Sequence, residues 1–96
     1  MESTWYLYIL RCKDDTLYTG ITTDVEKRLD AHRSGKGAKY TRGRGPLELV
    51  YRECCGNHSQ ALKRELQIKS LSREEKQRLI AESVAGENVL KDGKQP

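Results

Sequence analysis

The fold of this chain follows from one stretch, YTGITTDVEKRLDAH, which covers residues 18–32. The stretch continues a short apolar, β-prone run, Leu17 to Ile21, which predicts a strand. A helix follows almost at once, from about Asp24 to Arg33. Thr23 and Glu26 have the spacing of a capping box, in which each side chain binds the other residue's backbone N–H. The stretch therefore predicts a strand that passes directly into a capped helix.

One stripe of this predicted helix combines apolar and ionisable side chains. Val25, Leu29 and His32 lie on the same stripe, and Arg28 lies beside it, one turn before His32. Charged groups are usually kept away from such a boundary, because burying them without a partner is costly. We therefore expect a functional site where this helix meets the strand before it.

Two further strands are predicted outside this stretch. Thr4 to Cys12 is rich in aromatic and branched residues, and a turn at Lys13 to Thr16 joins it to the strand at Leu17 as a hairpin. Leu47 to Cys54 alternates in polarity and predicts a third strand. Its alternation places Leu47, Leu49 and Tyr51 on one face, and Glu48, Val50 and Arg52 on the other.

The length of the hairpin loop decides whether Tyr8 and Tyr18 share a face of the sheet, because side chains alternate along a strand. A three-residue loop pairs Lys13 with Leu17 and places both tyrosines on one face, whereas a two-residue loop places them on opposite faces. The turn has no glycine to distinguish these cases. We predict the same-face pairing, because only that arrangement lets both hydroxyls reach one site.

Two helices are predicted after the third strand. The first is capped by Asn57 or Ser59 and continues to about Ser70, with Glu65 in the middle of its apolar arc. The flanks of that arc are Ala61 and Ile68 on one side, and Leu62 and Leu66 on the other. A capping box at residues 72–75 starts the second helix, whose apolar face ends before Gly86.

The predicted elements follow the order ββαβαα, which indicates a small α/β (α+β) domain with a three-stranded, largely antiparallel sheet packed with helices. The 96 residues suffice for one domain, which we place at residues 1–85. Residues 86–96 are polar and aperiodic, which favours a disordered C-terminal tail.

Positive charge is concentrated in one segment. Residues 27–44 hold seven basic residues against one acid, a net charge of +6, while the rest of the chain sums to −2. Such a block favours contact with a phosphate backbone, although a solvated basic loop has the same composition. The expected nucleic-acid contacts are Lys36, Lys39, Tyr40, Arg42 and Arg44.

We expect a cytoplasmic protein with no membrane contact. No run is long and apolar enough to span a bilayer, and no charged-then-apolar leader opens the chain. Three cysteines, two of them adjacent, make a poor disulfide framework and favour free thiols in a reducing compartment.

The chain resembles the GIY-YIG nuclease domain, in particular its small stand-alone bacterial branch, from about Trp5 to about Leu79. The motifs that carry the resemblance are Tyr6-Leu7-Tyr8, then Tyr18-Thr19-Gly20, Arg28, His32 and a glutamate on a later helix, Glu65. Two positions depart from the family pattern. Tyr6-Leu7 replaces Gly-Ile in the first triplet, and Thr19 replaces isoleucine in the second.

The resemblance implies a catalytic set of Tyr8, Tyr18, Arg28, His32 and Glu65. Glu65 would hold a single divalent cation, Mg²⁺ or Mn²⁺, although Lys69 at i+4 is an alternative partner for its carboxylate. Arg28 would contact the scissile phosphate with its planar donor fork. Tyr18 or Tyr8 would orient or deprotonate the attacking water, and His32 is either a proton-transfer group or an ordinary half-buried histidine.

The resemblance thus implies a metal-dependent endonuclease acting on DNA rather than RNA, connected with repair or recombination. Many GIY-YIG nucleases carry an asparagine beyond the glutamate helix, whereas the only later asparagine here is Asn88. The chain has no room for a separate specificity domain, so we expect structure-specific or weakly specific action, or a protein partner that supplies specificity. The alternatives are a nucleic-acid-binding module without efficient chemistry and a protein-interaction adaptor.

Overall fold

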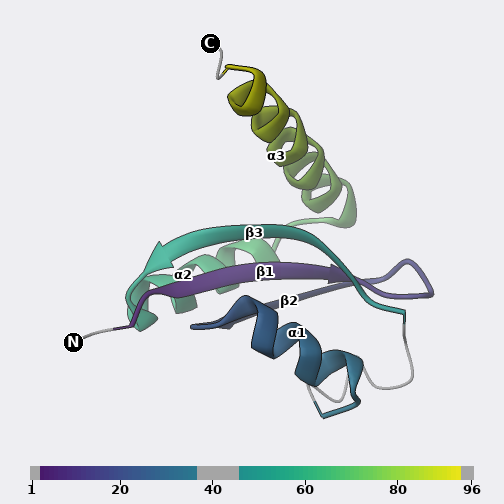
Figure 1. Ribbon diagram of the computed structural model, residues 1–96, viewed down its shortest axis with the longest axis vertical. Helices are drawn as coiled ribbons and strands as arrows, with labels where there is room; N and C mark the ends of the chain where they lie inside the picture. The colour runs from purple at the N-terminus through teal and green to yellow at the C-terminus, as the bar shows by residue number, and fades with distance from the viewer. Residues whose placement is uncertain (1–2, 37–45, 94–96) are drawn as a thin grey trace.

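The computed structural model describes residues 3–36 and 46–93, with side chains described as far as Ser83. Its elements follow the predicted order ββαβαα, with all three strands antiparallel in one sheet, so the predicted fold is confirmed. The elements are β1 (Trp5–Arg11), β2 (Leu17–Thr22), α1 (Val25–Arg33), β3 (Glu48–Gly56), α2 (His58–Lys69) and α3 (Arg73–Gly93) (Figure 1).

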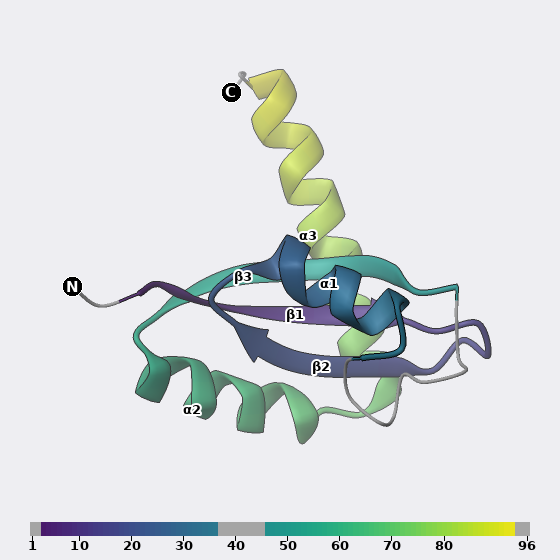
Figure 2. The ribbon, with the colours of Figure 1, turned by 60° about the horizontal axis from the view of Figure 1, so that its bottom comes forward.

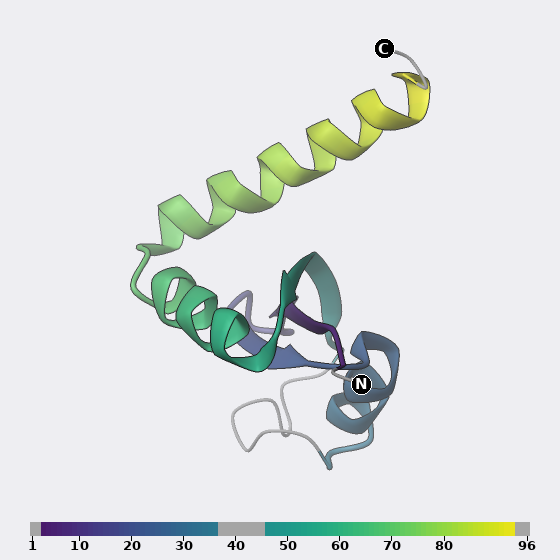
Figure 3. The ribbon, with the colours of Figure 1, turned by 90° about the vertical axis from the view of Figure 1, so that its left-hand side faces the viewer.

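The central strand β1 contributes to two apolar layers, one on each face of the sheet, whose strand order is β2-β1-β3. On one face Tyr8 and Leu10 pack with Val25 of α1. On the other face Leu7 and Ile9 pack with Ile68 of α2. The helices α1 and α2 accordingly lie on opposite sides of the sheet, as the side view shows (Figure 3). Each turned view also shows α3 projecting away from the sheet (Figures 2 and 3).

The hairpin register confirms that Tyr8 and Tyr18 share a face. Tyr8 lies opposite Gly20, and Tyr18 lies opposite Leu10. The three-residue loop predicts that Leu17 pairs with Lys13. In the structure Leu17 pairs with Arg11, so the register differs from the predicted one by two residues. A change of two residues preserves the parity, because side chains alternate with a period of two.

The predicted alternation of β3 is wrong in its middle. Ile9 pairs with Tyr51 but Leu10 pairs with Leu49, so one residue of β3, Val50, is left over at a β-bulge. Leu49 therefore packs on the α1 side of the sheet, whereas Val50 and Tyr51 both pack on the α2 side. A bulge inserts one residue into one strand and reverses the parity beyond it, which polarity alone does not reveal.

The helix caps match the sequence in two cases out of three. Asn57 and Gln60 form a capping box at the start of α2, and Ser72 and Glu75 form one at the start of α3. The cap predicted for α1 is wrong by one residue: Asp24 is the N-cap, and its carboxylate accepts from the Lys27 N–H at 3.0 Å. Aspartate caps a helix as well as threonine does, so the sequence held two competing signals.

The helix α3 continues to Gly93, whereas the sequence predicted its end before Gly86. A glycine in a helix costs about 1 kcal/mol relative to alanine but ends the helix only when its backbone adopts the left-handed conformation. Among the described residues, the glycines with positive φ are Gly35 and Gly56. The domain boundary at residue 85 and the disorder of residues 86–96 stay predictions.

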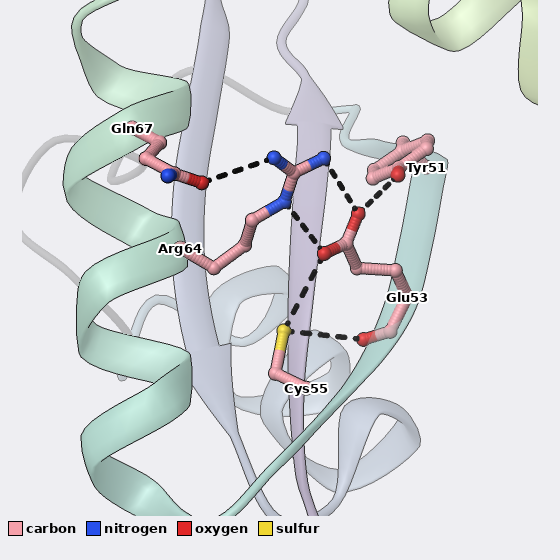
Figure 4. Close-up of polar contacts among 5 residues, drawn as sticks. All are labelled: Tyr51, Glu53, Cys55, Arg64 and Gln67. Atoms are coloured by element: carbon pink, nitrogen blue, oxygen red, sulfur yellow. Dashed lines mark hydrogen bonds and ion pairs between the residues drawn. The ribbon is translucent and has the colours of Figure 1, made fainter.

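A polar cluster ties α2 to β3 across the sheet (Figure 4). Arg64 donates from Nε and one terminal nitrogen to the two carboxylate oxygens of Glu53, at 2.7 and 3.2 Å. Tyr51 and Cys55 also donate to this carboxylate. Burial acts to raise the pKa of Glu53, but the hydrogen bonds from Arg64 and Tyr51 hold that pKa below its usual value. The cluster fixes α2 over the sheet, and Glu65 follows Arg64 directly in the chain.

Candidate active site

Tyr8 lies at the centre of the predicted site, and its side chain is 2% exposed. Its hydroxyl passes directly over Gly20 on the neighbouring strand. A Cβ atom at position 20 would lie 2.6 Å from this hydroxyl oxygen and 2.8 Å from the ring carbon that carries it. The glycine of the second triplet is therefore required for space, since its backbone does not need a positive φ.

His32 reaches Tyr8 from α1, and both side chains are buried. The Tyr8 hydroxyl lies 2.9 Å from Nε2 of His32, within hydrogen-bonding distance. Burial and the nearby charge of Arg28 lower the pKa of His32, which favours the neutral imidazole. The histidine on the predicted stripe is thus bonded to a member of the predicted catalytic set.

Arg28 lies close enough to Tyr8 to affect the acidity of its phenol. Burial raises the pKa of Tyr8 to about 12, while a hydrogen bond and the positive charge of Arg28 act in the opposite direction. A guanidinium only donates, so the Tyr8 oxygen is the acceptor for Arg28. Its own hydrogen then has the neutral imidazole of His32 as an acceptor. This order, Arg28 to Tyr8 to His32, gives the Tyr8 hydroxyl both a donor and an acceptor.

Tyr18 is the more accessible of the two predicted tyrosines, since its side chain is only half-buried. Its ring centroid lies 6.3 Å from that of Tyr8 and 5.2 Å from that of His32, with an edge-on arrangement to the imidazole. Both contacts are within the range of favourable aromatic pairs. Tyr18 therefore belongs to the same cluster and presents part of its side chain to solvent.

Glu65 completes the cluster from α2. Its negative charge acts to raise the pKa of Tyr8, more weakly than burial does. Its side chain is 18% exposed and pairs with Lys69 Nζ at 3.1 Å, the alternative partner that the sequence offered. The predicted apolar arc around it is wrong on one flank: Ala61 and Ile68 are buried, but Leu62 is 42% and Leu66 70% exposed. Glu65 lies at the edge of the helix's buried face, not in its middle.

The donor atoms of the site suit a cation that is completed by water and substrate. Within the described residues no three His, Cys, Asp or Glu side chains gather into a metal cage. Mg²⁺ commonly keeps several waters and takes only one or two carboxylates together with substrate phosphate oxygens. Glu65 is half-buried, and its carboxylate pairs with the largely exposed side chain of Lys69, so it fits that requirement.

Of the predicted nucleic-acid contacts, the structure describes Lys36, which is exposed just beyond α1. Lys39, Tyr40, Arg42 and Arg44 lie outside the described residues. Two residues that the sequence analysis did not select border the site. Lys69 binds Glu65, and Lys76 lines a pocket beside Tyr18. The i+4 spacing from Glu65 signalled Lys69, whereas nothing local signals Lys76, which arrives through the packing of α3.

The sheet, the helix order and the convergence of tyrosine, arginine, histidine and glutamate define a nuclease-type domain. The model of the GIY-YIG catalytic domain matches residues 4–78, which is most of the chain, and the protein belongs to this family. The family is one of nucleases, which generally use a divalent metal ion and act on nucleic acid.

Small proteins of many microorganisms are similar to this chain over most of their length. A UPF0213 protein of Haloquadratum walsbyi is 55% identical over 82 residues, which cover 85% of this chain and 92% of the relative. The UPF0213 protein YhbQ of Escherichia coli is 49% identical over 86 residues, covering 90% and 86%. Their shared designation names no activity.

Two solution NMR structures share the fold. The UPF0213 protein BH0048 of Bacillus halodurans is 50% identical, with a TM-score of 0.54 and coverage of 81% of this chain and 83% of that one. The protein EF2693 of E. faecalis is 37% identical, with a TM-score of 0.58 and coverage of 88% and 93%. As to membranes, no helix among the described residues has the length and apolar character needed to cross one.

Proposed function

We propose that this protein is a metal-dependent endonuclease that hydrolyses phosphodiester bonds in DNA. One observation carries the proposal: Tyr8, His32 and Tyr18 are packed together, with the Tyr8 hydroxyl 2.9 Å from His32 Nε2, and charges from both α1 (Arg28) and α2 (Glu65) act on the pKa of Tyr8. Phosphodiester hydrolysis needs a cationic contact for the phosphate, a carboxylate for a divalent ion and a group that handles the water's proton. The cluster supplies all three.

Each residue has a distinct part in the proposed reaction. Arg28 binds and orients the scissile phosphate through its donor fork. Glu65 holds a divalent ion, Mg²⁺ or Mn²⁺, which when bound neutralises charge on the phosphate and on the leaving oxygen. Tyr18 orients the attacking water. The water oxygen bonds to phosphorus while its proton passes to the phenolate of Tyr18. The bond to the leaving oxygen breaks, and that oxygen takes up a proton from solvent.

The two tyrosines differ in their access to that water. Tyr8 is buried, is bonded to His32 and has its pKa raised to about 12, so it is a poor base. A phenol with that pKa at neutral pH is almost entirely protonated. We therefore assign the water to Tyr18 and give Tyr8 and His32 the task of holding Arg28 in place.

The proposed substrate is DNA with a particular structure rather than a particular sequence. Lys36, Lys39, Tyr40, Arg42 and Arg44 would follow the backbone, and phosphate contacts position a protein without reading bases. Specificity would then come from branched or nicked DNA, or from a protein partner, in repair or recombination. A binding module without efficient chemistry is the alternative to which the absence of a matching asparagine points.

Replacing Glu65 by glutamine tests the proposal. The variant keeps the shape of the side chain but removes the charge that holds the ion, so cleavage should fall by orders of magnitude while DNA binding is retained or tightened. Binding, cleavage and melting are measured on branched, nicked and single-stranded DNA with Mg²⁺, Mn²⁺ or EDTA. Glu26→Gln is the matched control, because Glu26 is an exposed ion-pair residue of α1 outside the cluster.

Three outcomes separate the candidate functions. Loss of cleavage in Glu65→Gln but not in Glu26→Gln supports the nuclease. Wild-type protein that binds DNA but cuts none of the substrates with either ion favours the binding module. Wild-type protein that neither binds nor cuts DNA leaves the adaptor.

A further inference from the structure

Thr19 has a buried hydroxyl that no group satisfies. Its side chain is 3% exposed, and its hydroxyl oxygen has no hydrogen-bond partner among the described residues. Buried hydroxyls nearly always find a partner, so an unsatisfied one calls for an explanation. Thr19 also stands where the GIY-YIG pattern has isoleucine, which would fill the same space without the polar atom.

Thr19 also lines a pocket of about 250 Å³. The pocket is lined by Leu17, Tyr18, Thr19, Lys69 and Lys76. It therefore joins β2 to the end of α2 and the first turn of α3, which follow β2 only after more than 35 residues. One of its walls is Tyr18, so the pocket opens beside the candidate active site.

The charge of this pocket is positive. Lys69 and Lys76 bring one ammonium each from different helices. The only ion pair that the described residues form with either lysine is the bond of Lys69 to Glu65, at 3.1 Å. Lys76 is half-buried and lines the pocket. Two ammonium groups and a hydroxyl donor suit a compact anion with several acceptor oxygens.

We propose that this pocket is a phosphate-binding subsite for the nucleic-acid backbone, next to the scissile phosphate. The proposal rests on the proposed nuclease function, because Tyr18 is shared between the two sites. Thr19 turns its hydroxyl about χ1 into the pocket and donates it to the phosphate, and Lys76 and Lys69 neutralise the anion. The free phosphate ion has the same chemistry and serves as a probe of the pocket without DNA.

Lys69 links the subsite to the carboxylate of Glu65. In the structure its ammonium neutralises Glu65, and its side chain is 51% exposed, so it can turn without disturbing the core. Glu65 would release Lys69 when it holds a divalent ion, because both cations need the same carboxylate. Lys69 would then have a phosphate as its new partner, so ion binding and phosphate binding should favour each other.

Titration with inorganic phosphate, followed by NMR of the backbone amides, tests the pocket directly. We expect saturable shifts at Thr19 and Lys76 in wild-type protein, with at least threefold weaker binding in Lys76→Gln. Lys63→Gln is the matched control, since Lys63 is exposed on α2 and does not line the pocket. Glu65→Gln should bind phosphate more tightly, and the additional change Lys69→Gln should abolish that gain. Absence of shifts at Thr19 in wild type, or equal weakening in Lys63→Gln, would overturn the proposal.

Binding of a labelled DNA duplex separates this inference from the nuclease function. Lys76→Gln should weaken binding about tenfold and lower the salt slope by about one, as expected for one lost phosphate contact, whereas Lys63→Gln should change affinity less than threefold. If wild type cuts DNA but Lys76→Gln matches the control, the subsite is rejected and the nuclease stands. If phosphate shifts Thr19 but no DNA is bound or cut, the pocket stands as an anion site and its nucleic-acid assignment is rejected.

Discussion

Replacing Gly20 by alanine should destabilise the fold and disconnect Tyr8 from His32. The added methyl group would lie 2.6 Å from the Tyr8 hydroxyl oxygen, a contact that side chains do not tolerate. The tyrosine ring must therefore move by roughly 1 Å to regain van der Waals distance. It has little room, because the side chain is 2% exposed and packs against Val25 and Leu10.

The size of the effect follows from two costs and one gain. Overpacking a tight core costs about 1–3 kcal/mol. Loss of the 2.9 Å bond to His32 leaves a buried polar atom unsatisfied, which costs about 1–3 kcal/mol. Alanine is better than glycine within a strand by about 0.5–1 kcal/mol. We expect the free energy of unfolding to fall by about 2–4 kcal/mol.

Urea unfolding followed by the fluorescence of Trp5, the single tryptophan, measures this change. Tyr8→Phe removes the same hydrogen bond. The loss of unfolding free energy in the double variant, Tyr8→Phe with Gly20→Ala, should therefore be smaller than the sum of the losses in the two single variants. Gly35→Ala is the contrasting control: its Cβ meets no atom within 4 Å, and its cost of roughly 1–2 kcal/mol comes from φ at +82° alone. A Gly20→Ala protein within 0.5 kcal/mol of wild type, on the order of measurement error, would refute the steric argument.

Three further predictions address other residues. Thr19→Val should stabilise the protein by about 1 kcal/mol in urea unfolding, because it removes an unsatisfied buried hydroxyl; a loss of stability would show that the hydroxyl has a partner. The lowered pKa of His32 means that the unfolded chain takes up its proton first, so stability should fall as pH drops below about 6.5, and His32→Gln should flatten this fall. Replacing Lys36, Lys39, Arg42 and Arg44 by alanine should flatten a DNA-binding salt slope of about −3 to −4 while the melting temperature stays within a few degrees; unchanged binding would exclude this segment.

The sequence alone determined the elements and most of their boundaries. Period-two and period-3.6 patterns, together with the capping signals at Asn57 and Ser72, mark local structure, and local structure depends on neighbouring residues. The resemblance to the GIY-YIG domain also proposed the residues of the candidate site, because Tyr8, Tyr18 and Arg28 match its motifs in order. The parity of the two tyrosines was correctly predicted, but from the requirements of a shared site and not from the turn.

Only the tertiary structure decided how these residues meet. The bulge at Val50 changes which face of the sheet the side chains on one side of it point to. The sequence has no signal for this bulge, because both adjoining positions are apolar. The need for Gly20 arises from a tyrosine on the neighbouring strand. Burial likewise gives the two tyrosines different roles, because Tyr8 is buried and Tyr18 is only half-buried, which the sequence does not show.

The pocket at Thr19 is the clearest case of this difference. Its residues come from β2, α2 and α3, so their proximity depends on how the two helices dock on the sheet. Local spacing could show that Lys69 reaches Glu65, since i and i+4 share one face of a helix. It could not show that Lys76 lies beside Tyr18, because a contact across 58 positions of the chain exists only once the core has packed.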